Sequence, residues 1–365
     1  MDIRTRTRTR TRTRTRTRTR TRTRTRTRTR TRTRTRNIDF RRRTVLRAAV
    51  LLGALAAART GVAGDFPVKP IRLIVPAPPG GGTDAMARLV ANALAESVKW
   101  NVIAENRPGG GGNIGFDQAF RSPPDGYTLA LGESSNMIVN EFLYQRIPYD
   151  IEKDMQPIAL LAKVPLVLIV AAGGPYTSVE KLVAASRKRT ISFASSGNGT
   201  LAHLVGELWK SKAGLDMLHV PYRGAAPALT DLIGGQVDMF FASVPVALPM
   251  IQGGKVRALA VTAPARLSTL KDVPTMAQAG YAGMDASVVF GLVGPAGIPD
   301  GVAGEINAQV NKAMQSPAAT KQLLVMGVDR APGTFGGDPG SFAALLREER
   351  AKWAPVVKAS GAKVD

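Results

Sequence analysis

The sequence predicts an α/β protein with two lobes, and three observations support this fold class. From residue 65 onward, short β-branched and apolar segments alternate with segments whose apolar residues recur at helical spacing. Glycine-bearing turns separate several predicted strands from the helices that follow them. Two apolar segments, 158–170 and 288–293, are expected to cross between the lobes. Two lobes joined by two crossings have the geometry of a hinged clamshell with a central cleft.

The first lobe is placed at residues 64–163. Its strands are expected at 71–76, 101–105 and 128–132, and its helices at 83–97 and from the turn at 109–112 to about residue 121. The helix at 83–97 carries one apolar stripe at helical spacing, which consists of Met86, Leu89, Val90, Ala93 and Leu94. The crossing at 158–170 is interpreted as two strands nearly in line, joined around Val164 and Pro165.

The second lobe is placed at residues 164–287, and the chain is expected to return to the first lobe over 288–365. Second-lobe strands are predicted at 191–195, 217–221, 237–242 and 256–262, and helices at 178–188, 200–212, 225–233 and 246–252. After the return crossing, helices are predicted at 302–314, 318–326 and 340–360.

The charge of the chain is concentrated before the predicted lobes. The 365 residues include 50 Lys and Arg against 27 Asp and Glu, a formal net charge of +23. Of these, 22 arginines and two aspartates precede Gly64, so the remaining 28 basic and 25 acidic residues give the body a charge of only +3. Nucleic-acid binding depends largely on neutralising phosphates. We therefore expect no nucleic-acid partner.

Composition excludes several other classes of protein. The chain has no Cys, which excludes disulfides, thiol nucleophiles and cysteine-ligated metals. Its two histidines, His203 and His219, are too few for a typical histidine-built metal site, and no cofactor is expected. After residue 60, no apolar run reaches the roughly 18 residues that span a bilayer. The mature protein is therefore expected to have no stable membrane anchor.

The first 63 residues fall into two segments. Residues 1–36 are a low-complexity Thr–Arg repeat, expected to be disordered or absent from the mature protein; a functional polybasic arm is the alternative. Residues 37–63 have a basic start at Arg41, a weakly apolar run to Ala58 and small residues up to Ala63, the pattern of a signal peptide. The arginines followed by Thr-Val-Leu also resemble a twin-arginine signal. Both routes predict export to the periplasm.

Three glycine-bearing loops precede predicted helices, where backbone N–H groups and the helix dipole favour anions. In the first, 76–84, Thr83 is expected to cap the helix and Asp84 to suit its start electrostatically; no Gly-Lys-Ser/Thr follows, so a nucleotide site is not predicted. The second, 106–115, contains a formal Gly-x-Gly-x-x-Gly with Glu133 downstream. A lone match within a glycine run is weak support for a dinucleotide site.

The third loop, 193–200, gathers hydroxyl groups, an amide and two glycines at a strand-to-helix turn. Ser196 with His203 suggests a serine hydrolase, but Gly-x-Ser-x-Gly and an acidic relay are missing. Anion binding is the favoured interpretation, and a periplasmic hydrolase is retained as an alternative.

Several segments in order along the chain carry a resemblance to a known family. They are 79–84, 106–115, 124–129, 195–204, 219–238, 256–262, 272–275 and 352–361. Together they resemble the Bug family, the extracytoplasmic solute receptors of tripartite tricarboxylate transporters. The resemblance covers essentially all of 65–365. It implies a periplasmic-binding-protein-like clamshell of two α/β lobes whose central cleft holds a small carboxylate.

The resemblance also implies where the ligand binds. In the first lobe, the implied contacts are Pro78, Gly80, Gly81, Gly82, Thr83 and Asp84. In the second lobe, they are Ser195, Ser196, Asn198, Gly199, Thr200, His203, Arg223, Gly224, Ala226 and Ser243. Relatives often carry an acidic residue after the strand near 237–241, whereas Phe241, Ala242 and Ser243 stand there in this chain. This departure bears on the substituents of the ligand.

The favoured hypothesis is therefore a monomeric periplasmic receptor that delivers a carboxylate to the permease subunits of a tripartite tricarboxylate-type transporter. One alternative is a periplasmic receptor that reports to a sensor kinase, and another is the serine hydrolase. The identity of the ligand is left open, since citrate, C4-dicarboxylates, amino acids, aromatic acids and uncharged solutes are all compatible with these loops.

Overall fold

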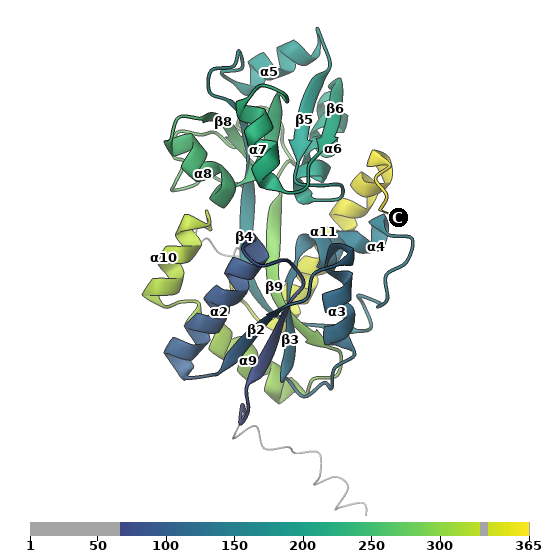
Figure 1. Ribbon diagram of the computed structural model, residues 1–365, viewed down its shortest axis with the longest axis vertical. Coiled ribbons are helices and arrows are strands. Elements are labelled where there is room, and N and C mark those ends of the chain that lie inside the picture. Colours follow the sequence, from purple (N-terminus) through teal and green to yellow (C-terminus); the bar gives the residue numbers. More distant parts are fainter. Residues whose placement is uncertain (1–65, 329–334, 365) are drawn as a thin grey trace, which may run out of the picture. The chain divides into compact units, whose positions relative to one another are not determined.

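The computed structural model describes residues 66–328 and 335–364. The predictions for the repeat at 1–36 and the signal peptide at 37–63 lie outside the described residues. Within them, strands and helices alternate along the chain, which confirms the α/β class (Figure 1). None of the described helices has the length and hydropathy needed to cross a bilayer.

The first lobe is built on a mixed sheet with the strand order β2-β1-β3-β9-β4. Strand β1 pairs in parallel with both β2 and β3, and β9 is antiparallel to β3 and β4. The strands are β1 Ile71–Val75, β2 Val102–Asn106, β3 Thr128–Glu133, β4 Met155–Ala171 and β9 Ser287–Pro295. Because β1, β2 and β3 run in the same direction, the loops that follow them leave one edge of the sheet.

The second lobe repeats this arrangement around the other half of β4. Strand β5 is parallel to β6 and β7, while β4 is antiparallel to β7 and β8. The strands are β5 Ile191–Ser195, β6 Met217–Pro221, β7 Met239–Ser243 and β8 Val256–Val261. The loops after β5, β6 and β7 therefore also share one edge.

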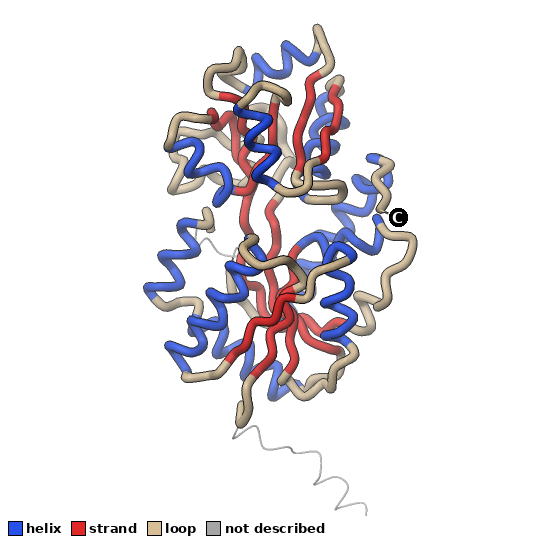
Figure 2. The backbone as a smooth tube through the Cα atoms, viewed as in Figure 1, coloured by secondary structure: helices blue, strands red, loops and turns tan. Residues whose placement is uncertain are grey.

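The crossing between the lobes differs from the prediction of two strands in line. Strand β4 is continuous: it pairs with β9 up to Pro165 and with β7 and β8 from Leu166 onward. Pro165 lacks an N–H to donate, so it is tolerated where the strand changes partners. The next amide, of Leu166, donates to Thr262 Oγ1 at 2.9 Å. Figure 2 shows β4 and β9 as two long strands that run between the two groups of helices.

The helices cover the faces of these sheets (Figure 1). Their bounds are α2 Gly82–Val98, α3 Asn113–Phe120, α4 Asn140–Leu143, α5 Val179–Ser186, α6 Leu201–Ala213, α7 Ala225–Ile233, α8 Val244–Gln252, α9 Asp300–Ala313, α10 Pro317–Val325 and α11 Pro339–Ser360. The predicted stripe of α2 is buried, as expected, and α2 packs against α9.

One helical segment was not expected from the sequence. The short turn η2, Gly110–Gly112, precedes α3 as predicted, but η3, Ser135–Val139, and α4 follow β3 without a predicted counterpart. The apolar residues Met137, Ile138 and Val139 are consecutive rather than spaced at helical intervals, and all three are buried. This segment matters because it forms part of the candidate site.

Candidate ligand-binding site

A cavity of about 320 Å³ lies at the carboxyl edge of β1, β2 and β3. The first lobe lines it with residues from 76–83, 108–112 and 133–144, and the second lobe with residues 198–200. Val364, near the end of the described chain, completes the wall; it forms a parallel bridge with Tyr144, and its N–H donates to Leu143 O at 3.0 Å. The cavity is therefore built from both lobes.

The first glycine loop leads directly into α2. This helix has Gly81 as its N-cap, and no side chain caps its first turn. The prediction that Thr83 caps the helix is wrong, because the helix begins one residue earlier, at Gly82. Instead, Thr83 Oγ1 donates to Glu133 Oε2 at 2.7 Å, and Thr83 lines the cavity.

Asp84 fixes the shape of this loop. Its Oδ2 accepts from the Gly80 N–H at 3.0 Å, an acidic side chain reaching back to the backbone much as in a capping box. Arg88 donates to both carboxylate oxygens at 3.0 Å, and Asn106 Nδ2 donates to Oδ1 at 2.9 Å. These donors, Arg88 first, lower the pKa of Asp84 to about 2. Asp84 is buried and is not among the described residues that line the cavity.

The second glycine loop contributes Gly109, Gly111 and Gly112 to the wall. All four glycines from 109 to 112 have positive φ, between 56° and 127°, a region that side chains disfavour. A Cβ at Gly112 would lie 2.7 Å from Asn136 Nδ2, and one at Gly111 would collide with the Tyr144 hydroxyl. Only glycine allows the loop to lie this close to η3 and α4.

Buried amides hold that loop in place. Asn140 Nδ2 donates to Gly111 O at 3.0 Å and to Asn113 Oδ1 at 2.8 Å. The Tyr149 hydroxyl donates to the same Asn113 oxygen at 2.8 Å. Asn140 thus holds the loop by a hydrogen bond, and Asn113 and Tyr149 extend this hydrogen-bond network.

The end of β3 brings a charged residue to the cavity that was not among the predicted ligand contacts. Glu133 lines the cavity, and its Oε1 accepts from Ser135 Oγ at 3.0 Å while Oε2 accepts from Thr83. The sequence did carry a signal for this position: β3 was a predicted strand, and a third strand parallel to β1 ends at the same edge.

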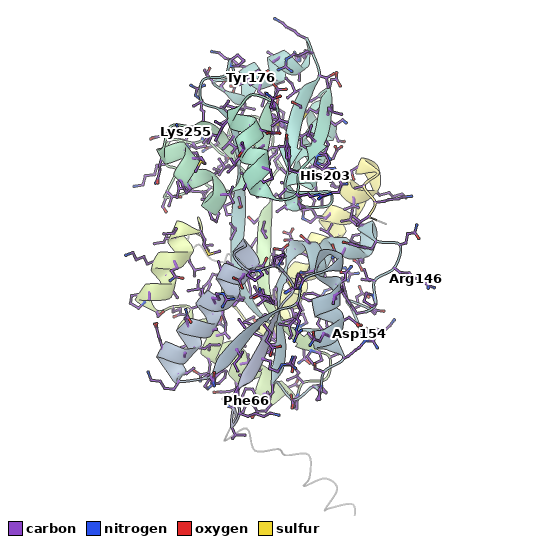
Figure 3. The ribbon with its side chains drawn as sticks, viewed as in Figure 1. Phe66, Arg146, Asp154, Tyr176, His203 and Lys255 are labelled. Carbon is purple, nitrogen blue, oxygen red and sulfur yellow. The ribbon has the colours of Figure 1, made fainter. Side chains whose placement is uncertain are left out.

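The third glycine loop forms the second-lobe wall through Asn198, Gly199 and Thr200. The Gly199 N–H donates to His203 Nδ1 at 3.1 Å, and Thr200 Oγ1 donates to Gly197 O at 2.8 Å. Thr200 is the N-cap of α6, yet no side chain caps that helix. His203, labelled in Figure 3, therefore supports the loop from within α6 rather than lining the cavity.

The buried His203 and the half-buried His219 stack against each other beneath this loop. The rings of His203 and His219 are nearly parallel, with centroids 3.8 Å apart, and His219 Nε2 lies 2.7 Å from Ser195 Oγ. Burial lowers the pKa of His203 to about 4. Burial, with the charges of His203 and Lys210, lowers the pKa of His219 to about 3. Both rings are therefore neutral at pH 7.

In this geometry, Ser196 and His203 do not form the catalytic pair that the serine hydrolase alternative requires. His203 uses Nδ1 for the Gly199 N–H, and its Nε2 faces Glu207 Oε1 at 3.9 Å, so neither nitrogen is directed at Ser196. Ser195, the serine that does contact a histidine, has no exposed surface. A nucleophile needs access to its substrate, and Ser195 has none.

The remaining predicted contacts follow the carboxyl ends of β5, β6 and β7 but do not line the cavity in the described chain. They are Ser195, Ser196, His203, Arg223, Gly224, Ala226 and Ser243. Backbone bonds from Tyr222 to Ser195 O and from Gly224 to Ser196 O tie two of these loops together. Arg223 is exposed. In the first lobe, Gly80, Gly81 and Gly82 also lie outside the lining set.

Uncapped helix N-termini from both lobes lie at the cavity: within the described chain, no side chain caps α2 or α3 of the first lobe or α6 of the second. Thr83 of α2 and Thr200 at the start of α6 both line it. Among the other described helices, Ser178, Ser316 and Asp338 cap α5, α10 and α11 with their side chains, whereas α7, α8 and α9 also lack a side-chain cap. No Lys or Arg is among the described lining residues, and no cluster suited to a metal ion occurs in the described chain. The arrangement offers N–H groups, hydroxyls and amides to a ligand.

Comparison with known proteins gives one consistent result. A family model described as "Tripartite tricarboxylate transporter family receptor" matches residues 86–362. A UPF0065 protein from Pseudomonas sp. (strain P51) is 37% identical over 319 residues, covering 87% of this chain and 94% of its own. Protein BugT of Bordetella pertussis is 36% identical over 305 residues, covering 83% and 92%.

Two solved structures of similar proteins contain a bound molecule. A protein of R. palustris with adipate aligns with a TM-score of 0.74 at 33% identity, covering 82% of this chain and 100% of that one. MatC from Rhodopseudomonas palustris, with bound malate, aligns with a TM-score of 0.69 at 30% identity, covering 80% and 100%.

Proposed function

Because the chain belongs to the family of tripartite tricarboxylate transporter receptors, which includes the Bug proteins, we propose that it is a periplasmic receptor for a small carboxylate. It captures the carboxylate between its two lobes and delivers it to the permease subunits of a tripartite tricarboxylate-type transporter. The observation that carries this proposal is that helix N-termini of both lobes, α2 and α3 in the first and α6 in the second, lie at one cavity.

The physical basis is anion binding without basic side chains. A helix N-terminus carries about half a positive charge, and a hydrogen bond to a charged group contributes roughly 1.5–3 kcal/mol. Micromolar affinity requires only about −8 kcal/mol in total, so a few such bonds suffice. A ligand that contacts both lobes stabilises the arrangement in which they meet.

The two solved relatives support a dicarboxylate as the ligand class, since one was solved with adipate and the other with malate. In this chain, Pro78, Thr83 and residues 198–200 already line the cavity. Gly80 to Gly82, Ser196 and the exposed Arg223 are proposed to approach a ligand that extends beyond it. Asp84 and His203 are proposed to act through the loops they hold.

We propose lobe boundaries at 64–163, 164–287 and 288–365. These boundaries are supported by β4, whose pairing partner changes from β9 to β7 and β8 next to Pro165. At the start of β9, Ser287 pairs with the same Pro165. The two proposed boundaries, one in β4 and one in β9, therefore lie next to each other in the β4–β9 pair.

Export is the part of the proposal that depends on the first 63 residues. Mass spectrometry of the receptor recovered from the periplasm is expected to show an N-terminus at Gly64 or Asp65. A product that stays in the cytoplasm or retains the Thr–Arg repeat would contradict it.

The receptor is also proposed to be a monomer. Light scattering is expected to give the mass of a monomer.

A thermal-shift panel tests ligand capture. The mature receptor is unfolded and refolded to remove any molecule from the host, then heated with mono-, di- and tricarboxylates, acidic amino acids and their amides. A ligand at 100 times its dissociation constant stabilises the fold by about 2.7 kcal/mol. We expect a shift with one carboxylate that its amide does not produce. A flat panel across all anions would overturn the carboxylate assignment.

Delivery is tested by uptake of the identified ligand in cells that lack the receptor. Loss of uptake, restored by the receptor gene, is the expected result. Unchanged uptake with loss of a transcriptional response to the ligand would instead favour a sensory role.

A further inference from the structure

Glu133 is the one charged side chain among the described residues that line the cavity. It stands at the carboxyl end of β3, half-buried, and its two oxygens accept from the hydroxyls of Thr83 and Ser135. Within the described chain it has no basic partner. An acidic group is therefore built into a cavity proposed to hold an acid.

This arrangement affects any ligand that enters. Two carboxylates in one partly enclosed cavity repel each other. Each oxygen of Glu133 accepts one hydrogen bond from the protein, and a carboxylate oxygen has room for a second. Glu133 therefore has acceptor capacity left and, among the residues that the structure describes, no basic partner.

We propose that Glu133 selects a ligand that carries an ammonium group beside its carboxylate, so that the receptor takes zwitterionic carboxylates in preference to plain ones. The assignment rests on the proposed function as a carboxylate receptor. The ligand carboxylate binds to the N–H groups of the loops, and the ammonium group pairs with Glu133.

The chemistry of the wall favours an ammonium group over a neutral donor. Thr83 and Ser135 already supply neutral hydroxyls to Glu133, whereas the described wall offers no positive side chain. What Glu133 lacks within the described chain is a cationic partner, and a primary ammonium group supplies that charge together with three donors.

The test compares pairs of compounds that differ only in the amine. Succinate and aspartate, glutarate and glutamate, and adipate and 2-aminoadipate are titrated into the refolded mature receptor by calorimetry. In the wild type, we expect at least one aminated member to bind about tenfold or more tightly than its partner. In Glu133→Gln, that preference is expected to disappear, because the amide carries no charge. Glu348→Gln, which removes an exposed charge outside the lining set, is expected to keep it.

The outcomes separate this inference from the proposed function. If plain carboxylates bind the wild type as tightly as their aminated partners, or if Glu133→Gln retains the preference, the role of Glu133 is overturned and the carboxylate receptor stands. If no member of any pair binds, the role of Glu133 is overturned, and the proposed function fails as well only when the wider carboxylate panel is also flat.

Discussion

Gly199 of the second lobe lies against Leu143 of the first, so closely that a Cβ at Gly199 would overlap Leu143 Cδ1. Both residues line the cavity. Gly199 also has φ +73°, and its N–H donates a hydrogen bond to His203 Nδ1. The two lobes thus meet at the cavity wall through a position where space and backbone conformation both require glycine.

Replacing Gly199 by Ala is expected to weaken ligand binding about tenfold or more, because positive φ strains a side chain by about 1–3 kcal/mol and the added methyl group displaces Leu143. Gly214→Ala is the matched control. Gly214 is the C-cap of α6, the helix that begins after Gly199 and Thr200, and has φ +59°; no atom of the described chain lies within 4 Å of the added Cβ. Gly214→Ala should lower the melting temperature but leave affinity unchanged. Equal affinity losses in both variants would show that the lobe contact is irrelevant.

Asp84→Asn is expected to destabilise the first loop by about 1–3 kcal/mol, the usual cost when a buried charged partner of several donors is lost. Its carboxylate accepts hydrogen bonds from the Gly80 N–H, Arg88 and Asn106. Asp117→Asn breaks an exposed i,i+4 pair with Arg121 and should cost less than about 0.5 kcal/mol. Urea unfolding of both variants measures the difference. Similar losses would mean that Asp84 does not fix the loop.

Acid is expected to destabilise the receptor below pH 6.5, because His203 and His219 are harder to protonate in the folded chain than in the unfolded chain. The folded pKa values of His203 and His219 are about 4 and 3, against 6.5 for an ordinary histidine. Between pH 6.5 and about 4 the unfolded chain binds more protons, so the free energy of unfolding falls as pH falls. At about 1.4 kcal/mol per pKa unit, His203 alone accounts for about 3 kcal/mol by pH 4.

Asp84 does not contribute to the slope between pH 6.5 and 4, whereas Glu207 opposes the histidines within that range. Asp84, with a pKa of about 2, loses its contribution only between pH 3.8 and 2. Burial raises the pKa of Glu207, which acts in the opposite direction above pH 4.5. Melting temperatures of His203→Gln and His219→Gln should therefore depend less steeply on pH, and those of Glu207→Gln more steeply. A wild-type slope unaffected by either histidine substitution would contradict the assignment.

Val364→Pro is expected to weaken ligand binding by about threefold or more without changing the fold. The substitution removes the N–H that donates to Leu143 O, a bond worth about 0.5–1.5 kcal/mol, and so releases the end of the chain from the cavity wall. Val364→Ala keeps that N–H and should bind nearly as well as the wild type. Calorimetric affinities that are equal for the two variants would show that this wall is dispensable.

The sequence predicted those parts of the fold that depend on local patterns. The stripe on α2 is set by residues three and four positions apart, and the glycine loops lie where predicted. The continuity of β4 was missed because Pro165 suggests a break, and only its pairing with β9 shows otherwise. Of the site, Asn198 and Gly199 were identified from their loop, while Glu133 and Val364 were not. Glu133 ends a predicted strand, but its place in the wall depends on the pairing of that strand with β1. Val364 reaches the wall through contacts with Leu143 and Tyr144, which lie far away in the sequence.

The position of β9 has a consequence for the order in which the lobes form during synthesis. In the sheet, β9 lies between β3 and β4, although Ser287 is made long after Glu133 and Met155. The sheet of the first lobe therefore has a gap between β3 and β4 until residues 287–295 have been made. The second lobe needs only the consecutive strands β4 to β8 to complete its sheet. The lobe that begins first along the chain is thus the last to close, because contacts of high sequence separation form late.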